Sequence, residues 1–92
     1  MHVEQVLDYN RDPAYLRHQL LYRLTLEADR ALQSGGISKR EIARRLDTSP
    51  AQLYRLLDTT NYRKSVDQLL RLLQVLDREV ELTVRPRKGS AR

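Results

Sequence analysis

Apolar residues recur at intervals of three and four along most of the chain, the spacing of helices with one buried face. The first such stretch opens at Asp12 and Pro13, an N-cap residue followed by proline at the first helical position. We expect this helix to reach about Gln33 and to end at Gly35 or Gly36. Its apolar stripe comprises Leu16, Leu20, Leu21, Leu24, Ala28, Ala31 and Leu32.

A different face of this long helix carries Tyr15, Tyr22 and Leu26. Scattered amphipathic residues often do no more than cover a protein surface. The same residues could form a second contact face for a twin subunit or another protein, and the pattern leaves both interpretations open.

Two short helices joined by a tight turn are predicted over residues 38–57. Ser38 with Glu41 and Ser49 with Gln52 each form the S-x-x-E/Q pattern of a capping box. Asp47 between them tolerates the left-handed backbone of a turn better than most residues. The apolar positions are Ile42, Ala43, Leu46, Leu53, Leu56 and Leu57.

Ala43 lies in the middle of the apolar face of the first short helix, where a small side chain allows a second helix to cross closely. This is the pattern of a DNA-binding helix-turn-helix, whose second helix enters a major groove. The alternative is an ordinary pair of packed helices. We favour DNA binding because the caps, the turn, the small residue and the basic charge agree.

A fourth helix begins after Ser65, which forms a third capping box with Gln68. The helix is apolar on nearly every side, so it must be covered on most sides. The other helices of this small domain can cover one broad face, and the apolar surface that remains suggests a subunit interface. Its apolar residues are Val66, Leu69, Leu70, Leu72, Leu73, Val75 and Leu76.

Strict alternation predicts a β-strand from Glu79 to Arg85, with Val80 and Val84 on its apolar side and Pro86 ending it. A lone strand is unstable, so it needs the same strand of a second subunit or the sheet edge of another protein. The predicted fold is mainly α: a bundle of four to five helices of the helix-turn-helix type, with a short C-terminal strand paired across a dimer.

This domain should span residues 12–86. The N-terminal segment, residues 1–11, could form a short helical turn or fray, and residues 87–92 should be a basic disordered tail that adds nonspecific affinity for DNA.

Composition narrows the possible functions. The 92 residues are 40% hydrophobic and 32% charged, with a net charge of +5 and a pI near 10.0, which favours a polyanionic partner such as double-stranded DNA. The absence of cysteine excludes thiol catalysis and fits a reducing, cytoplasmic setting. No apolar run suits a membrane, and no signal peptide is visible. Nothing resembles an enzyme site or a cofactor site, and His18 lacks the neighbours that a metal site needs.

The residues Ile42-Ala43, Leu46, Leu53 and Leu56, with the leucine-rich stretch that ends in V-E-L-T-V, resemble the Xre family of Cro/repressor-type helix-turn-helix proteins. That ending resembles HigA-type antitoxin regulators in particular. The resemblance implies a homodimer on palindromic operators and, in the antitoxin branch, a ribonuclease toxin as partner. Two departures are Asp47, where the family has glycine, and Pro50-Ala51, where it has a polar base-reading residue.

By position, the resemblance also implies a set of DNA-binding residues: Lys39, Ser49, Gln52, Tyr54, Arg55, Thr60, Asn61 and Arg63. Arg55 could pair with guanine and Gln52 with adenine, although Gln52 cannot do so while completing its capping box. The polar loop over residues 58–64 suits phosphate contacts, or it is a plain connector. The leading hypothesis is therefore a homodimeric transcriptional repressor. The alternative is an antitoxin whose main role is to neutralise a ribonuclease toxin.

Overall fold

The computed structural model describes residues 12–86, which form four helices. Helix α1 spans Pro13–Ser34, α2 spans Lys39–Arg45, α3 spans Pro50–Leu57 and α4 spans Val66–Val75. The order and approximate limits of these helices are those predicted from the apolar spacing. The mainly α, helix-turn-helix architecture is therefore confirmed.

Each helix begins at a residue whose side chain accepts a hydrogen bond from a backbone N–H in the first turn. Asp12 accepts from Ala14 N at 3.0 Å, while Ser38, Ser49 and Ser65 each accept at 3.1 Å from the residue three positions later. Such caps satisfy N–H groups that have no partner within the helix. The predicted N-cap residues are therefore confirmed in position, and each accepts a hydrogen bond from the first turn of its helix.

Two helices end in the same left-handed motif, and both use aspartate where glycine is commoner. Asp47 has φ 56° after α2 and Asp77 has φ 61° after α4. At the first, Thr48 N donates to Ala43 O and Asp47 N donates to Arg44 O, at 2.9 and 3.0 Å. This pair of bonds is the Schellman arrangement, which satisfies the last carbonyls of a helix and turns the chain away from its axis.

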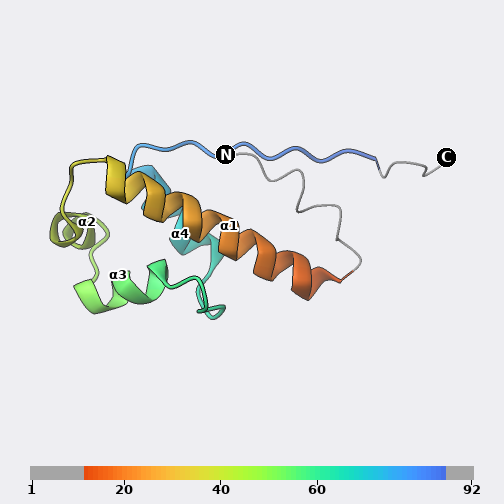
Figure 1. Ribbon diagram of the computed structural model, residues 1–92, viewed down its shortest axis with the longest axis horizontal. Helices are drawn as coiled ribbons and strands as arrows, with labels where there is room; N and C mark the ends of the chain where they lie inside the picture. Colours follow the sequence, from red (N-terminus) through yellow and green to blue (C-terminus); the bar gives the residue numbers. More distant parts are fainter. Residues whose placement is uncertain (1–11, 87–92) are drawn as a thin grey trace.

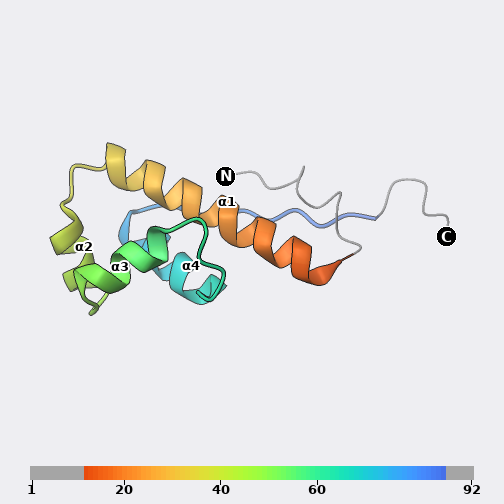
Figure 2. The same ribbon diagram turned by 60° about the horizontal axis from the view of Figure 1, so that its bottom comes forward.

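Helix α1 is the long element against which the others are arranged (Figure 1). Helix α1 contacts α3 and α4, and α2 also contacts α3 and α4. Figure 2 shows α2 and α3 near the C-terminal part of α1. One hydrophobic core holds the four helices together. Its buried residues are Leu21, Leu24, Ala28, Ala31, Leu32, Ile42, Ala43, Leu46, Leu53, Leu69, Leu72, Leu73 and Leu76.

The predicted apolar stripe of α1 faces this core, although Leu16 and Leu20 at its N-terminal end are less completely covered than the rest. On the other face, Tyr15 and Tyr22 are exposed. Helix α4 does not meet the prediction that it is apolar and covered on most sides. Its buried residues Leu69, Leu72 and Leu73 lie on one face, whereas Asp67, Gln68, Leu70, Arg71 and Gln74 are exposed. The described chain therefore covers one face of this helix.

The predicted strand over residues 79–85 is not formed: the described part of the chain contains no β-strand. Residues 79–86 run instead as extended chain along one side of the helices (Figure 1). The reason is that strand pairing requires a neighbouring backbone. No backbone hydrogen bond joins residues 79–84 to another of residues 12–86. The predictions for residues 1–11 and 87–92 lie outside the described residues.

Candidate nucleic-acid interface

The turn between α2 and α3 sets the two helices at a fixed angle. The Schellman bonds at Asp47 end α2, and the Ser49 cap with Pro50 behind it starts α3 directly afterwards. Because Ala43 and Leu53 are both buried, the facing sides of α2 and α3 pack together closely. The opposite side of α3 is consequently turned toward solvent.

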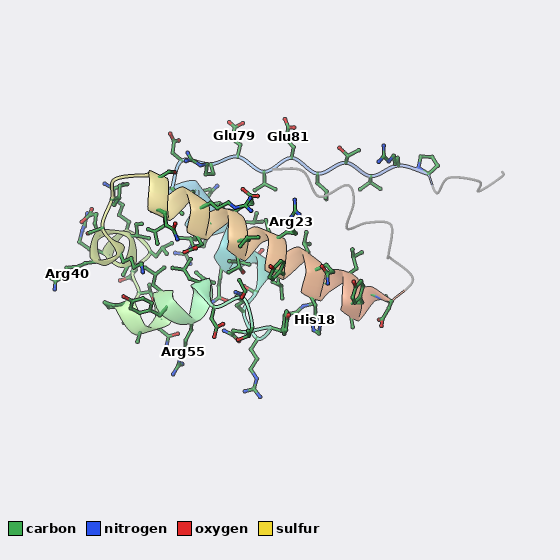
Figure 3. The ribbon with its side chains drawn as sticks, in the orientation of Figure 1. His18, Arg23, Arg40, Arg55, Glu79 and Glu81 are labelled. Carbon is green, nitrogen blue, oxygen red and sulfur yellow. The ribbon has the colours of Figure 1, made fainter. Side chains whose placement is uncertain are left out.

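Three residues predicted to contact DNA lie on this exposed side of α3. Gln52, Tyr54 and Arg55 are exposed, and Tyr54 keeps 58% of its surface accessible. The Arg55 side chain projects away from the body of the protein (Figure 3). An exposed helix face with these polar and cationic groups has the chemistry to reach base edges in a major groove.

The conflict over Gln52 is resolved by the way α3 is capped. Ser49 accepts from the Gln52 backbone N–H at 3.1 Å, but both halves of a capping box are present only at Ser65 and Gln68 among the described helices. The boxes predicted at Ser38 and at Ser49 are therefore half formed. The Gln52 side chain is not committed to the cap, so its carboxamide can face a ligand.

Lys39 and Tyr54 connect the two helices of the motif. The Lys39 ammonium lies 4.9 Å from the centre of the Tyr54 ring, within the range of a cation–π interaction. Both residues were predicted at the DNA interface as separate contacts. The structure brings them together, with the lysine charge held at the exposed edge between α2 and α3.

A carboxylate on α2 organises two arginines. Glu41 accepts hydrogen bonds from Arg44 and, at 2.9 Å, from Arg45. Hydrogen bonds from Arg44 and then Arg45 lower the pKa of Glu41 to about 2. This network replaces the expected return bond from Glu41 to Ser38 N. Arg40 points outward from α2 at the end of the molecule (Figure 3).

The loop after α3 is a set of interlocked turns. Asp58 Oδ1 accepts from the Thr60 hydroxyl at 2.7 Å and from the Thr60 backbone N–H at 2.9 Å, and these bonds lower the pKa of Asp58. Asn61 donates from Nδ2 to Arg55 O at 3.1 Å and accepts from Arg63 N at 3.1 Å. Thr60 and Asn61 thus shape the loop with the side-chain groups that had been predicted to reach phosphates.

Lys64 is a structural residue of this loop. Only 4% of its surface is exposed, and its ammonium donates to Leu56 O at 2.8 Å and to Asp58 O at 2.7 Å. Burial lowers its pKa. The side chain therefore holds carbonyls at the end of α3 and contributes little positive charge to the surface.

Helix α1 holds the other side of the loop, a role that sequence reasoning missed. The Arg17 guanidinium donates to Tyr62 O and Lys64 O, both at 3.2 Å. The His18 ring stacks on Tyr62 with 4.3 Å between ring centres. These partners are more than forty positions apart in the chain, so no local pattern could have revealed the contact.

An open depression beside α3 gathers most of the predicted DNA-binding residues. Of the predicted set, Gln52, Arg55, Thr60, Asn61 and Arg63 line it. The remaining three residues lie outside this lining: Lys39 is on α2, Ser49 caps the start of α3 and Tyr54 is on α3.

Residues 12–86 offer neither a metal site nor a membrane span. No group of three or more histidine, cysteine or acidic side chains there is placed to hold a metal ion. No helix in this part of the chain is long and apolar enough to cross a membrane.

The tight α2–α3 turn, the exposed face of α3 and the polar loop that follows it define a helix-turn-helix DNA-binding domain. A family model confirms this class: the helix-turn-helix domain of resolvase matches residues 15–60, or 46 of the 92 residues. The chain therefore belongs to this helix-turn-helix family. Neither the curated proteins nor the solved structures contain a significant match.

Proposed function

We propose that this protein is a homodimeric, sequence-specific transcriptional repressor that acts on its own operon. The observation that carries the proposal is the exposed face of α3, where Arg55 projects to solvent and the Gln52 side chain makes no return bond to the Ser49 cap. The family match supports DNA as the partner. The resemblance to Xre-type regulators, stated above from the sequence, supports the repressor role.

In this proposal α3 enters the major groove, with Arg55 bidentate to guanine and Gln52 available to adenine. Arg63 and the exposed cations of α2 contact phosphates, which position the protein without reading bases. Two copies place their α3 helices about 34 Å apart, one helical turn of DNA, on a palindromic site. The domain acts by binding, and we propose no catalytic step.

The test compares DNA from upstream of the protein's own gene with random duplex of equal length, over a series of salt concentrations. We expect tight, two-fold-symmetric protection of the upstream DNA only. Arg55→Ala should cost roughly 1–3 kcal/mol at one base position. Arg30→Ala is the matched control, because it removes the same charge from an exposed position on α1.

Equal binding to both duplexes would refute sequence-specific recognition. If Arg55→Ala weakened specific and random DNA alike, the assignment of a base contact to Arg55 would be wrong, because only base contacts discriminate between sequences.

A second candidate is the antitoxin role, in which the protein binds and neutralises a ribonuclease toxin. The observation that favours it is the extended segment over residues 79–84, whose backbone could add to the sheet edge of another protein. Copurification of one small basic protein from the native operon, with loss of that protein's ribonuclease activity, would establish this role. Repression of the operon without any such protein would contradict it.

A further inference from the structure

The extended segment begins at a fixed point on the helical body. After the left-handed Asp77, Arg78 N donates to Leu73 O at 2.8 Å, and the Arg78 guanidinium reaches Ser34 Oγ at 3.4 Å. Val80 then shares a depression with Ala31 of α1 and Leu73 of α4. The direction in which the segment leaves the body is therefore set by contacts with both helices.

Beyond Val80, apolar side chains become progressively more exposed. Val80 is 37% exposed, Leu82 61% and Val84 80%. On the opposite side of the segment, Glu79 and Glu81 point away from the helices (Figure 3). The alternation predicted from the sequence is thus present in three dimensions. The segment has an apolar side, and no backbone hydrogen bond joins residues 79–84 to another of residues 12–86.

We propose that residues 79–85 pair with the same segment of a second copy as a two-stranded antiparallel ribbon, in which the Leu82 side chains of the two copies lie opposite each other. This identifies the surface of the dimer proposed above and rests on that proposal. If one strand slid past the other by an odd number of residues, apolar side chains would lie opposite polar ones. Moving the central, self-paired residue by one position slides the strands by two residues and keeps like faces together. The choice therefore lies among registers that keep like faces together.

Three such registers are centred on Glu81, Leu82 and Thr83. Centring on Glu81 places two like charges directly opposite, which is destabilising. Centring on Thr83 places Val80 opposite Pro86, which has no N–H to donate to the ladder.

Centring on Leu82 uses every residue from 79 to 85. It places Glu79 of each copy opposite Arg85 of the other, so the two ends of the ribbon are charge-complementary. On the apolar side, Val80 of each copy lies opposite Val84 of the other. The segment is therefore self-complementary in charge and in apolar character, a property that favours a second copy over an unrelated partner.

The position of the segment suits a DNA-binding dimer. In Figure 1 the segment and α3 lie on opposite sides of α1. Pairing through residues 79–85 would therefore leave the exposed face of α3 uncovered. The apolar side of the ribbon would face the helices, because Glu79 and Glu81 point away from them.

The first test uses charge reversal in the full-length protein, with the dimer dissociation constant measured by analytical ultracentrifugation. Glu79→Arg and Arg85→Glu each turn two complementary pairs into two repulsive ones. Each should raise the dissociation constant about tenfold. A one-to-one mixture of these two variants should restore dimerisation, because both end pairs of the mixed dimer then join opposite charges, one as in the wild type and one with the signs exchanged. Glu81→Arg, which faces Thr83 in this register, is the matched control.

The second test uses disulfide cross-linking, which is clean because the chain has no cysteine. Leu82→Cys should form a covalent dimer readily, since residues directly opposite have Cβ atoms about 4.5–5.5 Å apart. Thr83→Cys should react more slowly and Arg85→Cys hardly at all. Faster cross-linking of Thr83→Cys would overturn the register. A monomeric wild-type protein, or a dimer unaffected by all of the charge reversals, would overturn the interface.

Both tests are read on the protein without DNA, so their outcomes do not depend on DNA binding. Arg55→Ala should cross-link through a cysteine at position 82 as readily as the parent does. Failure to cross-link with specific DNA binding retained would refute only this interface. Cross-linking without sequence-specific DNA binding would refute the proposed function and leave the dimer intact.

Discussion

Replacing Lys64 with methionine should test how the loop after α3 is held in place. Methionine keeps the apolar stem of the side chain but removes the ammonium that bonds Leu56 O and Asp58 O at 2.8 and 2.7 Å. Lys64 is 4% exposed, so water cannot fully replace these donors. We therefore expect the variant to be destabilised, with the end of α3 and the start of the loop loosened first.

The magnitude follows from two opposing effects. Hydrogen bonds to a charged group contribute about 1.5–3 kcal/mol each, while removing a buried charge recovers part of the cost of its desolvation. The net loss of unfolding free energy should be about 2–3 kcal/mol. A domain of this size has only about 5–14 kcal/mol in total. The melting temperature should fall by about 10–20 °C.

The assay is urea unfolding followed by circular dichroism, with Arg63→Met as the control in the same loop. The exposed control should change stability by less than about 0.5 kcal/mol. Because burial lowers the pKa of Lys64 below 10.5 in the folded state, the wild type should gain stability relative to Lys64→Met as the pH rises toward 10.5. A variant as stable as the wild type would refute the reasoning, since the two carbonyls would then need no buried donor.

Three further predictions concern the helix-turn-helix and its loop. Asp47→Gly should stabilise the domain by about 0.5–1 kcal/mol in thermal unfolding, because glycine adopts positive φ without strain, whereas Asp47→Ala should destabilise it; a stabilising alanine would contradict this. Glu41→Gln should be less stable than the wild type at neutral pH. That difference should be complete above pH 4.5 and vanish as the pH falls toward 2, because the lowered pKa stabilises the folded state only while Glu41 is ionised; a difference that persisted in acid would exclude the ion pairs as its cause. Arg63→Ala should weaken binding to all DNA sequences alike and reduce the salt slope by about one, and an unchanged slope would remove Arg63 from the phosphate contacts.

The helices themselves were predictable because their signals are local. A serine or aspartate cap acts within three residues, and an amphipathic face repeats within one or two turns. Asp12, Ser38, Ser49 and Ser65 accordingly begin the four described helices as predicted. The left-handed turn at Asp47 was predictable for the same reason, since aspartate tolerates that backbone.

The sequence grouped the candidate DNA-binding residues in one region of the chain, but it did not predict which bonds their side chains make in the fold. Gln52, Arg55 and Arg63 line one depression beside α3. Thr60 and Asn61 line it too, yet their polar groups bond within the loop. Spacing along a sequence shows which residues share a region. It cannot show which of two available partners a hydroxyl or an amide will choose, because that depends on small differences in distance and angle within the folded chain.

The sequence by itself determined the helices, their caps, the α2–α3 turn and the alternating pattern of residues 79–85, all of which arise from interactions between near neighbours. Only the tertiary structure decided that Arg17 and His18 of α1 hold the loop, and that Lys64 is buried beneath α3 rather than presented to DNA. It also decided that residues 79–84 remain unpaired with the backbone of the rest of the described chain. The physical reason is that burial and backbone pairing depend on which distant segments meet in space. In the dimer that we propose, the missing neighbour of this segment comes from a second chain.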